Sequence, residues 1–127
     1  NMQEKPDYRD VVLDILNFLE AKINFAIDCG IKKDKIIIDP GIGFGKTLAH
    51  NLEILKRIEE FKILGVPILV GASRKSFVGT ILDKNPKERL FGSLAVATLM
   101  HDKGVDILRV HDVAATKECC KIAEMIK

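Results

Sequence analysis

Apolar residues recur at steps of three and four along the first part of the chain, which is the spacing of one face of an α-helix. This pattern predicts a helix from Asp7 to Cys29, with Gly30 as its C-terminal cap. The apolar stripe of this helix consists of Val12, Ile15, Leu16, Leu19, Ile23, Ala26 and Ile27. The next apolar run, from Ile36 to Ile38, is short and apolar on both faces, as in a parallel strand covered on two sides.

A second helix and strand follow in the same order. We expect Asn51 to cap this helix and Gly65 to end it. Its inner face carries Leu52, Leu55, Ile58 and Phe61. The apolar run 66–70 predicts the second strand, and a polar loop at 71–76 comes directly after it.

A third helix and strand continue the pattern. After a short helical patch at 77–82, the run NPKE at 85–88 has the N-cap residue, proline and glutamate that start a long helix, and Gly104 ends it. The run 106–111 predicts a third strand, and Asp112 is expected to cap a last helix. We expect that helix to bury Val113, Ile122 and Met125.

Helices that alternate with strands indicate an α/β fold. The spacing between the strand starts fits βαβ units of roughly 30 or more residues, whose strands are parallel neighbours. The polar loops after the strands therefore meet at one edge. An open sheet and a barrel give the same local pattern, and a complete eight-unit barrel takes about 250 residues. The chain has 127 residues, so a single domain is the default, and its start at Asn1 and Met2 suggests a piece of a longer protein.

The loop after the first strand contains a candidate site. In the run DPGIGFGKT, Asp39 ends the strand, and alternate glycines from Gly41 to Gly45 let the backbone approach a ligand closely. Asp39 could equally be only a turn former. The run differs from a P-loop because Pro40 replaces the first glycine, and from the dinucleotide fingerprint because Lys46 stands at its last glycine.

The other two loops contribute cations. Arg109 and His111 lie two apart on the third predicted strand and so share a face, where they could bind a phosphate. An arginine inside an apolar strand needs an anion, but a structural ion pair with Asp39 or Asp112 would also satisfy it. Lys75 in the second loop could be a further anion ligand or a solvated surface charge.

Composition excludes several classes of protein. Twenty basic and 18 acidic residues are spread along the chain, so no basic patch indicates nucleic-acid binding. No apolar run approaches the roughly 20 residues that span a bilayer. The histidines, His50, His101 and His111, form no zinc motif, and the first two are expected at the surface. The three cysteines are expected to be reduced in a cytoplasmic protein.

Three runs together resemble the dihydropteroate synthase family, the folate-pathway enzymes blocked by sulfonamides. They are DPGIGFGK at 39–46, GASRKSF at 71–77 and RVHDV at 109–113, and the opening MQEKPDYRDVV resembles the segment after that family's fifth barrel strand. The resemblance implies a partial TIM (β/α)8 barrel of about three parallel strands alternating with helices. Residues 1–127 would form a single domain, the C-terminal part of the pterin-binding barrel.

The resemblance also implies a reaction and a set of site residues. The reaction joins 6-hydroxymethyl-7,8-dihydropterin pyrophosphate to 4-aminobenzoate, with Mg²⁺ bound by residues outside this chain. Catalytic roles fall on Lys75, Arg109 and His111. Substrate-binding roles fall on Asp39, Phe44, Gly71, Lys75, Ser76, Arg109 and His111. Asp39 would hold the pterin edge, Lys75 would contact the pterin, and Arg109 with His111 would bind the diphosphate. Phe44 and Ser76 would line the 4-aminobenzoate pocket.

The missing part of the barrel leaves two alternatives open. The chain by itself is expected to be inactive, and a homodimer is expected because family members associate through C-terminal helices. A methyltetrahydrofolate-type methyltransferase shares the pterin-binding logic, although the SRK and RVHD motifs favour the synthase. A non-catalytic pterin-binding or assembly module is the second alternative.

Overall fold

The computed structural model describes residues 10–43 and 45–127. Helix α1 (Val11–Asp28) begins after Asp10, whose carboxylate accepts the backbone N–H of Leu13 at 3.0 Å. The helix ends at Cys29, and Gly30 follows with a left-handed φ of 101°. The predicted C-terminal cap is therefore confirmed, because a glycine adopts this conformation without strain from a Cβ.

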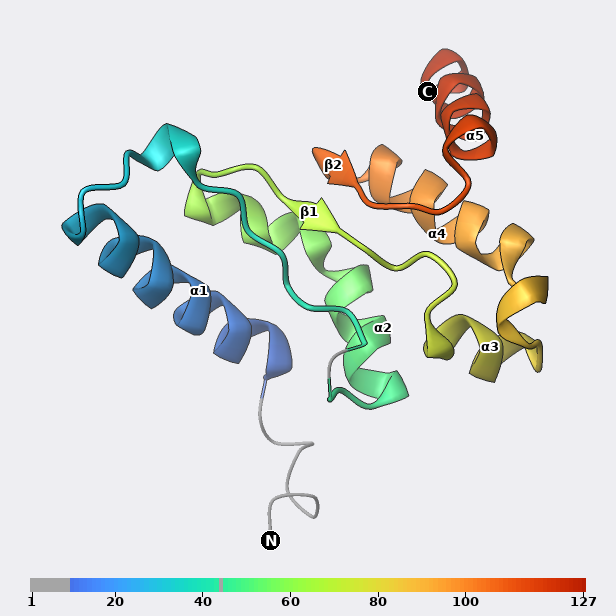
Figure 1. Cartoon of the computed structure of the whole chain (residues 1–127), viewed down its shortest axis with the longest axis horizontal. Coiled ribbons are helices and arrows are strands. Elements are labelled where there is room, and N and C mark those ends of the chain that lie inside the picture. The colour runs from blue at the N-terminus through green and yellow to red at the C-terminus, as the bar shows by residue number, and fades with distance from the viewer. Residues whose placement is uncertain (1–9, 44) are drawn as a thin grey trace, which may run out of the picture.

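Three parallel segments lie side by side in the order of the sequence. Ile38 forms a parallel bridge with Ile68, and β1 (Leu69–Val70) pairs in parallel with β2 (Ile107–Leu108). Figure 1 shows these extended segments in the middle of the molecule, with α1 on one side, α4 and α5 on the other, and α2 below β1. The order and direction of the strands were predicted correctly, but the strands are shorter than predicted.

The third strand stops early for a visible reason. The N–H of Arg109 still donates to the carbonyl of Val70, whereas the N–H of His111 donates to the side chain of Ser73 at 3.2 Å. The backbone ladder is thus replaced by a side-chain hydrogen bond where the polar loops begin.

The second helix begins one turn earlier than predicted. Helix α2 (Leu48–Lys56) is capped by Thr47, whose hydroxyl accepts the N–H of His50 at 3.1 Å. The predicted cap at Asn51 is wrong, since Asn51 is buried within the helix. A 3₁₀ segment, η4 (Ile58–Leu64), follows α2, and Gly65 ends it with φ of 73° as expected.

The third long helix begins later than predicted. Short helix α3 (Ser76–Leu82) precedes η5 (Pro86–Glu88), a single 3₁₀ turn that Asn85 caps by accepting the N–H of Lys87. Helix α4 (Leu90–Asp102) starts only after this turn. The NPKE run therefore caps a separate turn rather than α4 itself.

The last helix, α5 (Val113–Ile126), packs mainly on α4. Val113, Ile122 and Met125 are 57%, 61% and 77% exposed, so their predicted burial is wrong. Among the described residues, too little packs on that side of α5 to cover them.

The core lies between the strands and the helices. Its most deeply buried side chains include Phe61, Ile42, Ile54, Ile58, Ile68, Val12 and Val70. On the other side of the strands, Ile37 and Ile107 are exposed. Such a sheet, with helices along one face only, is the architecture predicted for part of a TIM barrel, where the inner face is normally filled by side chains from all eight strands. Within residues 10–43 and 45–127, every helix is too short or too polar to cross a membrane.

Candidate functional site

The loops that follow β1 and β2 enclose a hollow of about 230 Å³. It is lined by Gly71, Ser73, Lys75, Arg109, Val110 and His111. Four of the predicted site residues therefore line one surface, as the strand order predicted: Gly71, Lys75, Arg109 and His111. An ammonium, a guanidinium and an imidazole around one hollow suit a ligand with several negative charges.

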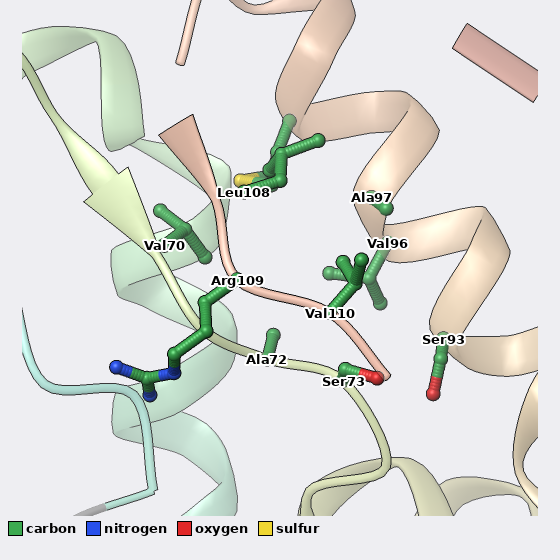
Figure 2. Close-up of a pocket in the computed structure, with 10 residues that line it drawn as sticks. Val70, Ala72, Ser73, Ser93, Val96, Ala97, Leu108, Arg109 and Val110 are labelled. Carbon is green, nitrogen blue, oxygen red and sulfur yellow. The ribbon is translucent and has the colours of Figure 1, made fainter. Parts of the chain in front are cut away.

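Alternation along the chain aims Arg109 at this hollow. Figure 2 shows Val110 directed toward α4, where Val96 lies, and Arg109 directed to the opposite side. The gap on the α4 side is only about 10 Å³, which leaves no room for a substrate. A ligand would therefore bind on the face of this segment from which Arg109 projects.

Arg109 is not the buried cation that its place in an apolar run predicted. Its side chain is 56% exposed, and its Nη1 lies 3.7 Å from Oδ2 of Asp39. That separation is longer than a hydrogen bond, and an exposed pair of this kind stabilises a fold by only about 0–1 kcal/mol. The ion pair of Arg109 with Asp39, which the sequence offered as an alternative to ligand binding, is present. It leaves the guanidinium accessible to a ligand.

His111 is oriented by Ser73. The Ser73 hydroxyl oxygen lies 2.9 Å from Nδ1 of His111 and also accepts the backbone N–H of the same residue. The Ser73 hydroxyl can donate to Nδ1 or accept from it, depending on the ring tautomer. The tautomer in which the hydroxyl donates carries the ring proton on Nε2, where it can donate to an anion.

The glycine loop is held by side chains from the loop itself and from helix α2. Asp39 accepts the N–H of Gly41 at 2.8 Å, and Asn51 accepts the N–H of Gly43 at 2.8 Å. Lys46 donates to the carbonyl of Gly41 at 2.8 Å. A P-loop uses its backbone N–H groups and lysine to hold phosphates. Here two of those N–H groups and the lysine have protein partners, so the geometry supports rejecting the P-loop hypothesis.

The glycine loop also reaches Lys75. A Cβ at Gly43, where φ is 91°, would lie 3.4 Å from Cδ of Lys75. The pKa of Lys46 is lowered because burial disfavours its charged form, and the nearby carboxylate of Asp39 opposes this effect. The loop therefore brings Asp39 and Lys75 to neighbouring parts of one site.

Among the described residues, the predicted site residues Asp39 and Ser76 do not line the hollow. Ser76 is the first residue of α3 and is exposed. Phe44 lies outside the described residues. His101 is partly exposed and contacts Glu124 at 2.9 Å, away from the hollow. In the described ranges, 10–43 and 45–127, no three histidine, cysteine or acidic side chains gather as metal ligands would.

Sequence reasoning missed several residues that hold the site in place. Asn51 is 3% exposed and Ser93 is 6% exposed, and each bonds to the backbone of a site loop. A signal was available, because each is a polar residue on the apolar face of its helix. A polar side chain at such a position usually has a buried hydrogen-bond partner.

The parallel strands, with helices beside them and a hollow at their carboxyl ends, define part of an α/β barrel. Residues 1–111 match the sequence family described as pterin binding enzyme, and the chain belongs to that family. Its relatives include dihydropteroate synthases. The chain is 47% identical over 121 residues to that of Haemophilus influenzae and 45% identical over 123 residues to that of Escherichia coli. These alignments cover 95% and 97% of this chain but only 44% of each relative.

Solved structures give the same result. The dihydropteroate synthase of Yersinia pestis in complex with a sulfonamide drug superposes with a TM-score of 0.91 at 44% identity, covering 99% of this chain and 46% of that chain. The enzyme of Coxiella burnetii in complex with pteroic acid gives a TM-score of 0.87 at 41% identity, covering 91% and 43%. The predicted fold and family are confirmed, and the chain spans less than half the length of these relatives.

Proposed function

We propose that the protein containing this chain is a dihydropteroate synthase, and that this chain supplies the diphosphate-binding part of its active site. The observation that carries the proposal is the convergence of Lys75, Arg109 and His111 on one hollow at the carboxyl ends of β1 and β2. Phosphate sites after late strands are a recurrent feature of this fold.

The proposed reaction requires anion stabilisation rather than a protein nucleophile. The amine nitrogen of 4-aminobenzoate forms a bond to the pterin methylene carbon, and the C–O bond to the diphosphate breaks. The electron pair leaves with the diphosphate, and the amine loses one proton to solvent. Negative charge therefore grows on the leaving oxygen, where Arg109 and the Nε2–H of His111 would stabilise it.

The remaining predicted residues have proposed binding roles. Asp39 would accept hydrogen bonds from the amino-pyrimidine edge of the pterin, since its 3.7 Å contact with Arg109 leaves Oδ2 with acceptor capacity. Lys75 would contact the pterin between its amino-pyrimidine edge, at Asp39, and its diphosphate, at Arg109. Gly71 would leave space beside Arg109, while Phe44 and Ser76 would contact 4-aminobenzoate.

The expected Mg²⁺ does not fit the described residues as a site of their own. Mg²⁺ prefers oxygen ligands, whereas the charged groups around the hollow are cations. Any Mg²⁺ of the proposed enzyme would need ligands from the diphosphate and from elsewhere in the protein. A cytoplasmic location belongs to the same proposal and is supported by the three free cysteines.

We also propose that the chain by itself binds ligands but does not turn them over, and that the protein forms a homodimer. The exposed inner-face residues Ile37 and Ile107 support the first point, because the other barrel units that would complete the substrate pocket also cover that face. The apolar surface of α5 supports the second.

Calorimetry with 6-hydroxymethyl-7,8-dihydropterin pyrophosphate tests the proposal. We expect the full-length gene product to bind it, Asp39→Ala to abolish binding, and 4-aminobenzoate to trigger release of pyrophosphate. Binding without pyrophosphate release would favour the non-catalytic module, and methyl transfer from a methylated folate would favour the methyltransferase. No binding of the pterin pyrophosphate by the full-length protein would contradict the synthase proposal.

A further inference from the structure

Arg74 has a backbone conformation that needs an explanation. Its φ is 55°, in the left-handed region, although it is not a glycine. A residue of this kind persists only where its surroundings hold it. Arg74 lies between Ser73 and Lys75, so its conformation decides how both side chains leave the loop.

Three separate groups hold Arg74 in this conformation. Its backbone N–H donates to Oγ of Ser93 at 2.7 Å, and its carbonyl accepts Nη1 of Arg89 at 3.0 Å. Its own Nη2 donates to both carboxylate oxygens of Asp112, at 2.9 and 3.0 Å. Ser93 is nearly buried and lies on the side of α4 that faces this loop (Figure 2). The backbone and the side chain of Arg74 are therefore fixed from independent directions.

The ion pair with Arg74 engages Asp112, which the sequence predicted to be the N-cap of the last helix. Asp112 is at the N-cap position of α5, but its side chain makes no capping hydrogen bond. Aspartate is among the best N-cap residues, so this carboxylate gives up a local stabilising bond. It pairs with Arg74 instead, 38 residues away in the sequence.

The pair joins the two loops of the hollow. Arg74 is directly between Ser73 and Lys75, and Asp112 directly follows His111. The contact of Ser73 with His111 crosses between the same two loops. Moving either partner of the ion pair would therefore change the distance between Lys75 and His111.

We propose that Arg74 and Asp112, supported by Ser93 and Arg89, are positioning residues that form a loop latch. The latch holds the loop of Lys75 and the loop of His111 at the separation that a diphosphate requires. None of the four needs to touch the substrate. The proposal deepens the proposed function and rests on it for the identity of the ligand.

The test compares variants of the full-length gene product. Asp112→Asn weakens the latch by removing the charge with little change of shape. The matched control is Glu124→Gln, which removes the charge from the 2.9 Å contact of Glu124 with His101, a contact between α4 and α5 away from the hollow. Hydrogen exchange of residues 71–76 and the affinity for inorganic pyrophosphate are measured for each.

We expect Asp112→Asn to accelerate exchange at 71–76 and to weaken pyrophosphate binding by about tenfold or more, since small misplacements of binding groups cost this much. Glu124→Gln should change neither. Arg74→Lys, which keeps a cation near the carboxylate, should recover part of the affinity that Arg74→Met loses.

Each outcome decides one question. Unchanged exchange at 71–76 in Asp112→Asn overturns the latch, and so does faster exchange with unchanged pyrophosphate affinity. If the unaltered protein does not bind pyrophosphate, the proposed function fails at its anion site. The latch as a link between the two loops is then judged on hydrogen exchange alone.

Discussion

The side-chain oxygen of Asn51 accepts the backbone N–H of Gly43 at 2.8 Å, which fastens helix α2 to the glycine loop. Asn51 is almost fully buried, so water cannot replace this acceptor easily. The same loop carries Asp39 at its start and approaches Lys75 beside Gly43. The geometry of the pterin side of the proposed site therefore depends on one amide that the ligand does not contact.

Replacing Asn51 with alanine should damage both stability and binding. The variant leaves the N–H of Gly43 without its acceptor, which should lower the free energy of unfolding by about 1–3 kcal/mol. It should also weaken binding of the pterin pyrophosphate, as measured by urea unfolding and calorimetry.

The matched control for this change is Asn85→Ala. Asn85 also accepts one backbone N–H, that of Lys87, but it lies at the exposed turn before α4. We expect this variant to lose stability of about 1 kcal/mol with unchanged pterin affinity. Equal losses of affinity in the two variants would show that Asn51 acts only through general stability.

Gly71 should be required because of Arg109 and not because of backbone conformation. A Cβ at position 71 would collide with the guanidinium of Arg109. The guanidinium is the end of a flexible, exposed side chain, so it can move away. Gly71→Ala should therefore leave the free energy of unfolding nearly unchanged while weakening pyrophosphate binding.

A double-mutant cycle checks this cause. Arg109→Gln by itself should weaken pyrophosphate binding with little loss of stability, because its exposed pair with Asp39 contributes little. In the Arg109→Gln background, Gly71→Ala should have no further effect on affinity. Additive losses would mean that Gly71 contacts the ligand by itself. A large loss of stability in Arg109→Gln would restore the structural ion-pair interpretation.

Arg57 should stabilise the fold at neutral pH and lose this effect in acid. Its guanidinium lies 2.9 Å from Asp10 and 2.7 Å from Glu60, and these hydrogen bonds lower the pKa of both carboxyls. Carboxyls with lowered pKa values stabilise the fold above their ordinary values, 3.8 for Asp10 and 4.5 for Glu60. That contribution is lost as the pH falls through the pKa values of the folded state.

Arg57→Gln should therefore destabilise the protein at neutral pH, and its difference from the unaltered protein should shrink as the pH falls below about 4.5. Urea unfolding at several pH values measures this difference. Lys22→Gln serves as the control. It also removes one positive charge, but the ammonium of Lys22 lies over the ring of Phe18. A difference for Arg57→Gln that stays constant with pH would disprove the role of the two carboxyls.

Local patterns were sufficient to predict the order of helices and strands and the residues that meet in the hollow. Apolar periodicity located the helices, and left-handed glycines ended them at Gly30 and Gly65. Lys75, Arg109 and His111 converge because each follows a parallel strand, a consequence of topology that needs no side-chain detail.

Contacts between distant residues account for the errors. Thr47 and Asn51 are both good N-cap residues, and the choice between them depends on the packing of Asn51 against the glycine loop. Asp112 occupies a cap position, but Arg74, 38 residues away, takes its carboxylate. The apolar pattern of α5 predicted burial, yet whether Ile122 is covered depends on what packs against α5.

The apolar face of α5 should hold the proposed homodimer together. Between α4 and α5 is a groove of about 500 Å³ lined by Thr98, Glu118, Cys119, Ile122, Ala123 and Ile126. A charge at Ile122 would have to be desolvated in a dimer, so Ile122→Glu should yield a monomer by analytical ultracentrifugation.

Ile63→Glu is the matched control, since Ile63 is 82% exposed on η4, and this variant should stay dimeric. Both changes lie on the surface and should alter the free energy of unfolding of the monomer by no more than about 0.5 kcal/mol. A dimer that survives Ile122→Glu but dissociates in Ile63→Glu would move the interface to η4.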